Sequence, residues 1–385
     1  MKIKGYRREN GKVGIRNRLI VLPTSVCASE TAVRIAEHIE EAVALPHQHG
    51  CCQIGADHEQ TVNTLVGLGK NPNVGAVLVI GLGCEGAEPG DIAERIAETG
   101  KTVAKITIQE CGGTLKAIEK GTRIVRDLAN DLVLMEKEEV DLSEITLAIE
   151  CGGTDATSGI AANPAVGGVS DKLIKLGGTA MLSETTELIG AEHILAERAI
   201  NEKVREKLLN IVERTEKRAM SLGVDIRGGQ PTPGNITGGV TTIEEKSLGC
   251  IYKAGTADIS GVLEYGEVPS RKGFYVMDTP GQDIESITGM LAGGAQIVIF
   301  TTGRGTPTGS PLAPVIKVTG NSNTYTNMID NIDINAGKII EEGLTIEDLS
   351  EEIFNFMLEV CNGRKTKAEL LGHKEFGIYK LAPTF

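Results

Sequence analysis

The sequence predicts an α/β protein with two doubly wound, mostly parallel sheets of the Rossmann or flavodoxin-like kind, with helices on both faces of each sheet. The first observation is an alternation, because short runs of Val, Ile and Leu are followed by amphipathic stretches with helical period. The second is composition. Aromatic residues make up 3% of the 385 residues and Trp is absent, so aliphatic side chains must build the core, as in buried parallel strands. The third is the number of glycines, 48, many of which follow the apolar runs.

The first half of the chain repeats the order strand, then helix. The predicted strands cover residues 18–24, 44–46, 75–80 and 102–108, and the predicted helices cover 29–43, 60–68, 91–99 and 115–135. Residues 136–143 are acidic and polar and form only a short segment. We therefore expect a domain boundary there, with an N-terminal α/β domain at residues 1–138 and a C-terminal α/β domain at residues 139–385.

The same order starts again in the second half. Strands are predicted at residues 145–149, 178–182, 273–277, 296–300 and 314–318. Helices are predicted at 191–221, from 242 onward and at 350–360, and residues 228–239 form a loop rich in Gly and Pro. Many strands in both halves end in a Gly-rich turn that carries Cys, Glu, Asp, Thr or Arg. Because ligands of open α/β sheets bind beyond the carboxyl ends of the strands, we expect the functional site at these turns.

The charge balance excludes two classes of partner. Asp and Glu number 52 and Lys and Arg number 39, which gives a net charge of −13. Binding to nucleic acid or to an anionic membrane requires a basic surface, so we expect neither. No apolar signal segment follows the first residues, and the longest apolar runs have the length of a strand. We therefore expect a cytoplasmic protein without a membrane span.

Several common motifs are absent or incomplete. The eight cysteines form no Cys-x-x-Cys pair, which argues against a disulfide scaffold and a zinc ribbon. A Gly-x-Gly-x-x-Gly motif at residues 81–86 follows a predicted strand, as a dinucleotide site requires. Residues 88–90 separate it from the next helix, so an NAD-binding oxidoreductase is only an alternative. The chain has no Walker A motif, no Gly-x-Ser-x-Gly and no His-Glu-x-x-His.

Metal-binding side chains follow several of the predicted strands. The turns carry His47 with Cys51, Cys84 with Glu85, and Glu150 with Cys151. Thiolates favour iron, iron–sulfur clusters and zinc, and added imidazole or carboxylate suits iron or zinc. Two arrangements stay open: an iron–sulfur cluster on three thiolates with one open iron, or a single Fe²⁺ or Mn²⁺ held by imidazole and carboxylates. Buried structural thiols are the alternative to both.

Cationic side chains lie in segments rich in Gly and Thr, which suggests an anionic ligand. They are Arg16, Lys246, Arg304 and Lys317. Arg pairs with a carboxylate through two hydrogen bonds, and turns at helix N-termini add N–H donors. This combination suits a small polyhydroxy carboxylate. Arg304 favours it most, because glycines flank this residue and an apolar strand precedes it, whereas ordinary surface charge explains Arg16 and Lys317 equally well.

Seven motifs in a fixed order resemble those of the altronate/galactarate dehydratase family. They are His47-x-x-Gly50-Cys51, Gly81-Leu82-Gly83-Cys84-Glu85, Glu150-Cys151-Gly152-Gly153-Thr154-Asp155, Leu182-Ser183-Glu184-Thr185, the segment from Gly234-Asn235 to Lys246-Ser247-Leu248-Gly249, Met277-Asp278-Thr279-Pro280-Gly281, and Phe300-Thr301-Thr302-Gly303-Arg304-Gly305. The resemblance runs from about Gly5 to the C-terminus. It implies a lyase that dehydrates a sugar acid to a 2-keto-3-deoxy acid with the help of iron or a similar divalent metal.

The resemblance also has implications for partners and alternatives. A related branch, the sulfolactate sulfo-lyases, releases sulfite instead of water. Long family members carry an extra N-terminal SAF domain, so this chain is expected to be the large subunit of a split enzyme that needs a separate small SAF-domain subunit. A homo-oligomer is expected as well. A sugar-acid-binding subunit without catalytic activity remains an alternative from another class.

The resemblance assigns roles to individual residues. It places the metal among Cys51, Cys84 and Cys151, with His47 as ligand or base. The alternative ligands are Glu85, Glu150 and Asp155. Lys246 and Arg304 would hold the substrate carboxylate, and Asp278 would act as acid or base. The residues expected around the substrate are Arg16, Asn17, Asp155, Asn235, Thr241, Thr242 and Lys317. A metal suits this reaction because the α-proton of a carboxylate is weakly acidic and the anion needs electrophilic stabilisation.

Overall fold

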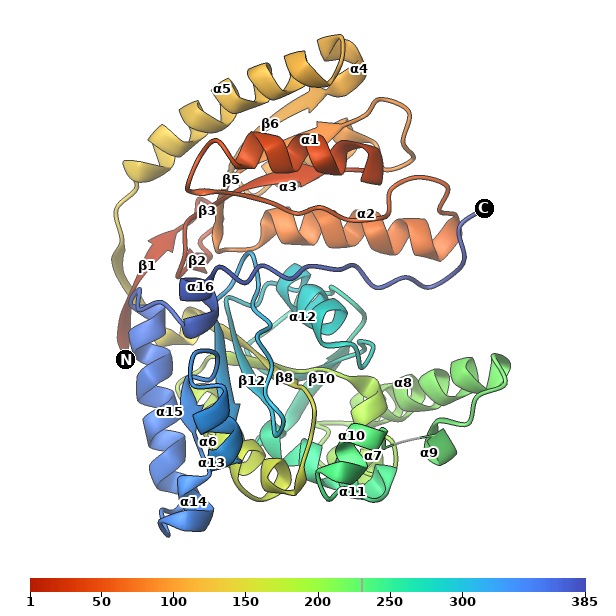
Figure 1. Cartoon of the computed structure of the whole chain (residues 1–385), viewed down its shortest axis with the longest axis vertical. Helices are drawn as coiled ribbons and strands as arrows, with labels where there is room; N and C mark the ends of the chain where they lie inside the picture. The colour runs from red at the N-terminus through yellow and green to blue at the C-terminus, as the bar shows by residue number, and fades with distance from the viewer. Residues whose placement is uncertain (230) are drawn as a thin grey trace.

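Two parallel sheets flanked by helices form the framework of the chain, as the sequence predicts (Figure 1). The computed structural model describes residues 1–229 and 231–385. The smaller sheet has the strand order β4-β3-β5-β6 and the larger has the order β10-β11-β9-β8-β12-β13-β14. All paired strands of both sheets run parallel. In Figure 1 the smaller sheet and its helices lie at the top and the larger sheet lies in the lower half.

The smaller sheet is formed by the N-terminal part of the chain, for which we keep the name N-terminal domain. Its elements are β3 (Arg18–Pro23), α1 (Val26–Ala36), β4 (Ala42–Ala44), α2 (Gly55–Lys70), β5 (Val74–Gly81), α3 (Pro89–Ala97), β6 (Thr102–Thr107), α4 (Ile108–Cys111) and α5 (Thr114–Val133). Every residue of β5 is buried, as expected for a central parallel strand. Helix α1 is shorter than the predicted helix, because the chain leaves it at Ala36 to form β4.

The structure also contains a third, antiparallel sheet, which the sequence analysis did not predict. Strand β1 (Lys2–Arg7) pairs with β2 (Val13–Gly14) on one side and with β7 (Glu138–Asp141) on the other. Ile3 lies opposite Val140, and both side chains are buried in the core of the larger domain. The chain therefore passes from one parallel sheet to the other through a strand that pairs with the N-terminus.

The larger sheet and its helices make up the C-terminal domain. Its elements are β8 (Thr146–Cys151), α6 (Asn163–Lys175), β9 (Thr179–Leu182), α7 (Glu192–Ala196), α8 (Glu202–Ser221), α9 (Ile226–Gly229), α10 (Pro233–Thr237), α11 (Ile243–Ile251), β10 (Ile259–Leu263), β11 (Gly273–Met277), α12 (Asp283–Ala292), β12 (Ile297–Thr301), β13 (Val315–Thr319), α13 (Ser322–Asn327), β14 (Ile334–Asn335), α14 (Lys338–Glu341), α15 (Ile346–Cys361) and α16 (Lys367–Leu371). The predicted helix 191–221 is divided in two, because the Asn201 side chain accepts from the Val204 N–H and starts α8 afresh.

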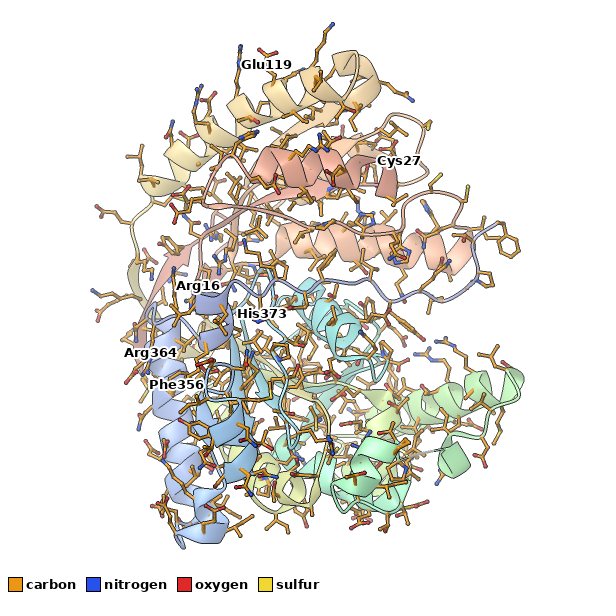
Figure 2. The ribbon with its side chains drawn as sticks, in the orientation of Figure 1. Arg16, Cys27, Glu119, Phe356, Arg364 and His373 are labelled. Atoms are coloured by element: carbon orange, nitrogen blue, oxygen red, sulfur yellow. The ribbon has the colours of Figure 1, made fainter. Side chains whose placement is uncertain are left out.

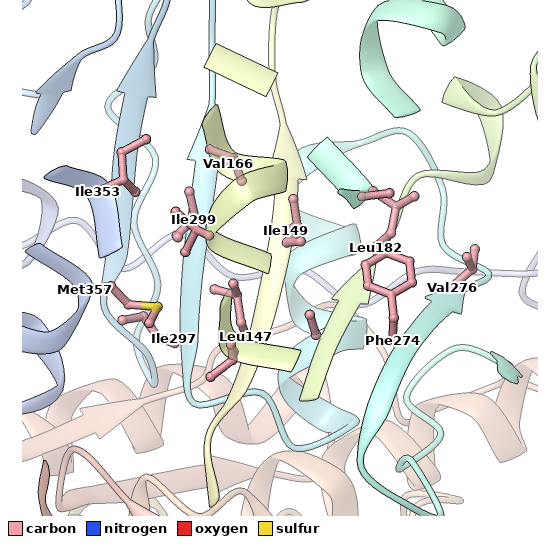
Figure 3. Packing of buried hydrophobic residues seen from close by; sticks show 14 of the residues in the cluster. Leu147, Ile149, Val166, Leu182, Phe274, Val276, Ile297, Ile299, Ile353 and Met357 are labelled. Carbon is pink, nitrogen blue, oxygen red and sulfur yellow. The ribbon is translucent and has the colours of Figure 1, made fainter. Parts of the chain in front are cut away.

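Aliphatic side chains fill the space between the larger sheet and its helices (Figure 3). Leu147 and Ile149 of β8 lie beside Ile297 and Ile299 of β12, and Ile353 of α15 is part of the same buried cluster. The alternate residues of these strands face the other side of the sheet, where a second cluster includes side chains of the N-terminal domain. No helix among the described residues is long and apolar enough to cross a membrane.

Buried amides join the N-terminal domain to the amino ends of the large-sheet strands. The Asn73 Nδ2 donates to the Gln296 carbonyl at 2.8 Å, and the Gln296 side chain donates to the Val13 carbonyl at 2.6 Å. The same side chain accepts from the Thr146 N–H at 2.6 Å. The amino ends of β8 and β12 therefore contact the N-terminal domain, and their carboxyl ends point away from it (Figure 3).

Candidate active site

The carboxyl edge of the larger sheet carries a cluster of buried ionisable side chains. They come from the ends of β8 and β9, from α11 and the turn that follows it, and from the first residue of α12. The members are Glu150, Cys151, Glu184, Glu187, Lys246, Cys250, Lys253 and Asp283. Burial of this many charged groups costs free energy unless they compensate one another or bind a ligand.

Glu150 is the most deeply buried carboxyl group of the cluster, with none of its surface exposed. Its Oε2 accepts hydrogen bonds from the hydroxyls of Ser183 and Ser286, each at 2.8 Å. Its Oε1 is buried and has no hydrogen-bond partner among the described residues. Burial raises the pKa of Glu150 well above its usual range. A buried oxygen without a partner is the kind of group that binds a ligand.

Lys253 lies between two other carboxyl groups. Its Nζ is 3.0 Å from Glu184 Oε2 and 3.1 Å from Glu187 Oε2, and its side chain is 1% exposed. Glu184 adopts a left-handed backbone with a φ of 65°, which is strained for a residue with a side chain. That conformation is held by the Thr279 hydroxyl, which accepts from the Glu184 N–H at 2.7 Å. Glu184 Oε2 also accepts from the Cys151 N–H at 2.9 Å, so the end of β8 is fixed to this carboxylate.

Lys246 connects the buried cluster to an open cavity. Its Nζ is 3.2 Å from Glu187 Oε1. Burial opposes the ionisation of Glu187, but Lys253 and Lys246 outweigh this effect and lower its pKa to about 2. Glu187 in turn raises the pKa of Lys246, so both stay charged at neutral pH. Lys246 also lines a cavity of about 330 Å³ together with Thr186, Val224, Ile226, Thr232, Ile243 and Gly281.

Two sets of side chains in the cluster could hold a metal ion. Donor atoms of Glu150, Glu184 and Asp283 all lie within 4.8 Å of one another, and so do those of Cys151, Glu187 and Cys250. The first set fits a divalent cation better. It contains the unpartnered oxygen, and an ion there would offset carboxylates that otherwise repel one another. In the second set both oxygens of the only carboxylate contact lysines, which would repel a cation. In the first set a lysine contacts only one oxygen, the Oε2 of Glu184.

The remaining titratable members of the two sets have shifted pKa values. Burial, together with the nearby charge of Glu187, raises the pKa of Asp283 to about 6. The thiol of Cys250 donates toward Cys151 and lowers the pKa of Cys151 to about 7, although burial acts in the opposite direction. Shifts of this size at the carboxyl edge of a sheet are typical of functional sites.

Three residues that the sequence predicts near the substrate lie at the rim of this edge. Asp155 accepts from the Thr157 hydroxyl at 2.6 Å and from the Asn321 side chain at 3.0 Å, and it is buried. Asn235 donates to the carbonyl of residue 154 at 3.0 Å, which attaches α10 to the loop after β8. Arg304 is exposed, and one of its nitrogens donates to the carbonyl of residue 234 at 3.2 Å.

Other predicted residues have structural partners that occupy their polar atoms. Thr242 caps α11 by accepting from the Glu245 N–H, and Thr241 donates to the carboxylate of the same residue at 2.8 Å. Lys317 is fully buried and donates to the carbonyls of residues 307 and 308, and burial lowers its pKa to about 8. Asp278 accepts from the Thr185 hydroxyl and forms an ion pair with Arg214 of α8. Both members of this ion pair line a cavity of about 350 Å³, which is separate from the cavity that Lys246 lines.

The predicted residues of the N-terminal domain lie elsewhere. His47 is 7% exposed, its Nε2 lies 2.7 Å from the Pro23 carbonyl, and its Nδ1 accepts from the His49 N–H. The carbonyl can only accept, so the Nε2 carries the proton and neither nitrogen is free. Burial lowers the pKa of His47 to about 4. Glu85 accepts from three backbone N–H groups, at residues 82, 83 and 84, and from the Thr24 hydroxyl, so it organises its own turn.

The structure does not bring the three predicted metal-binding thiols together. Cys51 and Cys84 follow strands of the smaller sheet, whereas Cys151 ends a strand that points away from that domain. Arg16, labelled in Figure 2, also has a structural role, because it forms two hydrogen bonds of 2.8 Å with the carboxylate of Glu369 in α16. Its neighbour Asn17 donates to a carbonyl near the end of α5. We leave these N-terminal residues out of the candidate site.

Five members of the cluster are absent from the sequence-based prediction: Glu184, Glu187, Cys250, Lys253 and Asp283. A signal for two of them is present in the sequence. Lys246, Cys250 and Lys253 are spaced by four and then three residues, so they share one face of α11 and the turn after it. This spacing of two lysines and a cysteine on one helix face is the signal that could have pointed to Cys250 and Lys253.

Comparisons with known proteins agree on one family. A family model described as D-galactarate/altronate dehydratase, C-terminal, matches residues 142–384, and one described as D-galactarate dehydratase/altronate hydrolase, second domain, matches residues 5–133. The chain is 36% identical to altronate dehydratase of Bacillus subtilis (strain 168), over 99% of this chain and 78% of that protein. It is 38% identical to (2R)-sulfolactate sulfo-lyase subunit beta of Chromohalobacter salexigens, over 98% of this chain and 97% of that subunit. It is 34% identical to galactarate dehydratase (L-threo-forming) of Escherichia coli (strain K12), over 99% of this chain and 77% of that protein.

Proposed function

Because the chain belongs to the D-galactarate/altronate dehydratase family, we propose that it is a lyase that removes water from a sugar acid of the altronate or galactarate kind. The product would be a 2-keto-3-deoxy acid, formed when the α-proton and the β-hydroxyl leave and the enol converts to the ketone. The observation that carries the proposal is the buried, unpartnered oxygen of Glu150, in a cluster of carboxylates and lysines beside a cavity.

A divalent metal, iron or manganese, is part of this proposal. Glu150, Glu184 and Asp283 would hold it, because they form the set of oxygen donors that has a free position. Such an ion supplies Lewis-acid stabilisation of the charge that develops on the substrate carboxylate and hydroxyl. Oxygen donors suit Mn²⁺ and Fe²⁺, whereas an iron–sulfur cluster would require thiolates that converge on one place.

The lysines of the cluster have separate tasks in the proposed reaction. Lys246 faces the cavity and is kept protonated by Glu187, so it can bind the substrate carboxylate and stabilise the negative charge that builds up there. Lys253 is out of contact with solvent and holds two carboxylates in place. Apolar side chains such as Ile243 line the same cavity and limit access of water. Arg304, at the rim, would bind the far end of the substrate.

The proposal can be tested by turnover. Metal-stripped protein loaded with Mn²⁺, or with Fe²⁺ in the absence of oxygen, is incubated with altronate and galactarate, and 2-keto acid is measured. We expect that Lys246→Met lowers kcat/KM by about 100-fold or more, as for the loss of a charge-stabilising donor. Lys338→Met, at a surface ion pair with Glu352, is the matched control and should leave kcat/KM unchanged. Failure of the complete enzyme to form 2-keto acid from either substrate would contradict the proposal.

A second candidate is a sulfo-lyase that releases sulfite from a 3-sulfo-2-hydroxy acid. It is favoured by the match over 97% of a chain that is named as a sulfo-lyase subunit. The two reactions share the carboxylate, the α-proton and the 2-hydroxyl, and they differ in the leaving group. Sulfolactate therefore belongs in the same assay, with sulfite as the measured product.

A partner chain is also part of the proposal. The relative of nearly equal length is named as subunit beta, which supports a separate second subunit, of the small SAF-domain kind, for this chain. We further propose that the enzyme forms a homo-oligomer and acts in the cytoplasm, where its free cysteines stay reduced. Turnover should therefore be measured with and without the co-expressed small subunit.

A further inference from the structure

The cysteines of the N-terminal domain take no part in the proposed active site, and most of them gather at one edge of the smaller sheet. Cys27 lies in the first turn of α1, Cys51 and Cys52 follow β4, and Cys84 follows β5. Figure 2 shows Cys27 at this edge, well away from the larger sheet. All four are free thiols and exposed or half-buried, whereas the cysteines of the C-terminal domain are buried.

Two of these thiols face each other. The Sγ atoms of Cys51 and Cys52 are 3.7 Å apart. Cys52 has a φ of 56°, and among the described residues only Glu184 shares a positive φ with it outside glycine. The turn is held tightly, because a Cβ on Gly50, whose φ is 91°, would lie 1.9 Å from the Thr24 carbonyl oxygen. A strained backbone that keeps two adjacent sulfur atoms in contact is a specific arrangement.

We propose that Cys51 and Cys52 are a vicinal dithiol that closes reversibly to a disulfide by exchange with a low-molecular-weight disulfide such as oxidised glutathione. One thiolate attacks the added disulfide, forms a mixed disulfide and expels the first small thiolate. The neighbouring thiolate then attacks the protein sulfur of the mixed disulfide and expels the second. The two cysteine thiols are oxidised, the small disulfide is reduced to two thiols, and no other reactant is needed.

The disulfide would be easy to reduce again. The Cα atoms of adjacent residues are about 3.8 Å apart across a trans peptide, less than the shortest separation of about 4.4 Å that is usual for a disulfide. Strained and accessible disulfides have the more oxidising potentials that are typical of labile, regulatory bonds. The exposure of Cys52 and half-burial of Cys51 give a small thiol access to the bond.

Formation of the disulfide would also affect the C-terminal tail, which contacts Cys52. The N–H of Phe385 donates to the Cys52 carbonyl at 3.1 Å. The same tail is held further along by Asp57, which accepts from the Leu381 N–H at 2.6 Å. We expect the bond between the two adjacent sulfur atoms to change the backbone of Cys52 and weaken this one hydrogen bond. The contacts of Asp57 with residues 381 and 382 would remain, so only the end of the tail at Phe385 would be released.

Peptide mapping tests directly whether Cys51 and Cys52 form a disulfide with each other. The purified, reduced protein is treated with oxidised glutathione, remaining thiols are alkylated, and the protein is digested with trypsin. Both cysteines lie in the tryptic peptide 35–70, whereas Cys27 lies in 19–34 and Cys84 in 71–95. We expect peptide 35–70 to be unalkylated and two hydrogen atoms lighter, and to regain two alkylation sites after reduction. A disulfide that links two of these peptides, or a stable glutathione adduct in peptide 35–70, would overturn the proposal.

Two cysteine variants serve as matched controls, and cleavage of the C-terminal tail gives a second measurement. Cys51→Ser should retain glutathione on Cys52 as a stable adduct, because the second thiol is missing, and Cys84→Ser should still form the internal disulfide. Carboxypeptidase should remove Phe385 roughly two- to tenfold faster from the oxidised protein, the range expected for one lost backbone hydrogen bond. Equal rates for the oxidised and reduced protein would show that the tail does not respond. The map of the unsubstituted protein needs no catalytic activity, so its outcome is independent of the proposed reaction.

Discussion

Replacing Glu150 by Gln distinguishes a metal-binding carboxylate from a buried acid that only fills space. Gln has the same shape, and its amide oxygen can accept the hydrogen bonds of 2.8 Å that Ser183 and Ser286 now donate to Oε2. Its amide nitrogen takes the place of Oε1, which has no partner among the described residues. Without metal, we therefore expect the free energy of unfolding to change by no more than about 1 kcal/mol.

The difference appears when metal is added. A cation at 100 times its Kd stabilises the folded protein by about 2.7 kcal/mol, and a 100-fold loss of affinity reduces this to about 0.4 kcal/mol. The E150Q variant should therefore lose about 2.3 kcal/mol of metal-induced stability. With an unfolding entropy of about 2.1 cal/mol/K per residue over 385 residues, that corresponds to about 3 °C in Tm.

The measurement is thermal unfolding of metal-stripped protein during a titration with Mn²⁺ or anaerobic Fe²⁺. Glu144→Gln is the matched control, because Glu144 lies just before the same strand at its other end and pairs with Lys272 at 3.3 Å. That variant should keep the full rise in Tm. The same rise in E150Q as in the unsubstituted protein would refute Glu150 as a ligand.

Three further changes test other parts of the structure. Lys253→Met leaves Glu184 without a cation and Glu187 with Lys246 alone, and should lower the free energy of unfolding in urea by about 3–5 kcal/mol. A loss below about 1 kcal/mol would mean that the ion pairs of Lys253 do not form. Arg16→Ala should lower the free energy of unfolding by about 2 kcal/mol, because the pair with Glu369 is lost, and should leave KM unchanged. A raised KM with an unchanged free energy of unfolding would place Arg16 in the substrate site. His47 has a pKa of about 4 in the folded protein against about 6.5 in the unfolded chain, so the unfolded state takes up the proton first as the pH falls. Its contribution of roughly 3 kcal/mol to the free energy of unfolding is therefore present above about pH 6.5 and is lost toward pH 4. In His47→Gln the free energy of unfolding, measured in urea, should change less with pH over this range. The same slope in the variant and the unsubstituted protein would contradict the lowered pKa of His47.

The fold class and most strands of both parallel sheets could be predicted from the sequence, because buried parallel strands are nearly continuous aliphatic runs. The two edge strands of the larger sheet, β10 and β14, were not predicted. Residues 145–149 are such a run, and Glu150 and Cys151 follow it directly. The antiparallel sheet could not be predicted in this way. Its strands are short, and the pairing of Ile3 with Val140 joins positions that are far apart in the chain.

The composition of the site was harder to predict, because it depends on how the two sheets are oriented. Sequence places Cys51, Cys84 and Cys151 in equivalent positions, each after a strand, and nothing local indicates that the carboxyl edges belong to different regions. That difference arises from long-range contacts such as the one between Asn73 and Gln296. Lys253 is missed for another reason, since a lone lysine beyond a helix end is normally a solvated surface residue.

The buried amides between the two domains have a consequence for how the protein unfolds. A hydrophobic cluster extends from Leu22 and Leu65 of the N-terminal domain to Val298 and Phe300 of the other, and separating the domains would expose all of it together with several unpaired amide groups. Each half also has a hydrophobic cluster of its own, and the shared cluster links the two interiors. We expect the two halves to melt in a single cooperative transition and to lack a hinge between them.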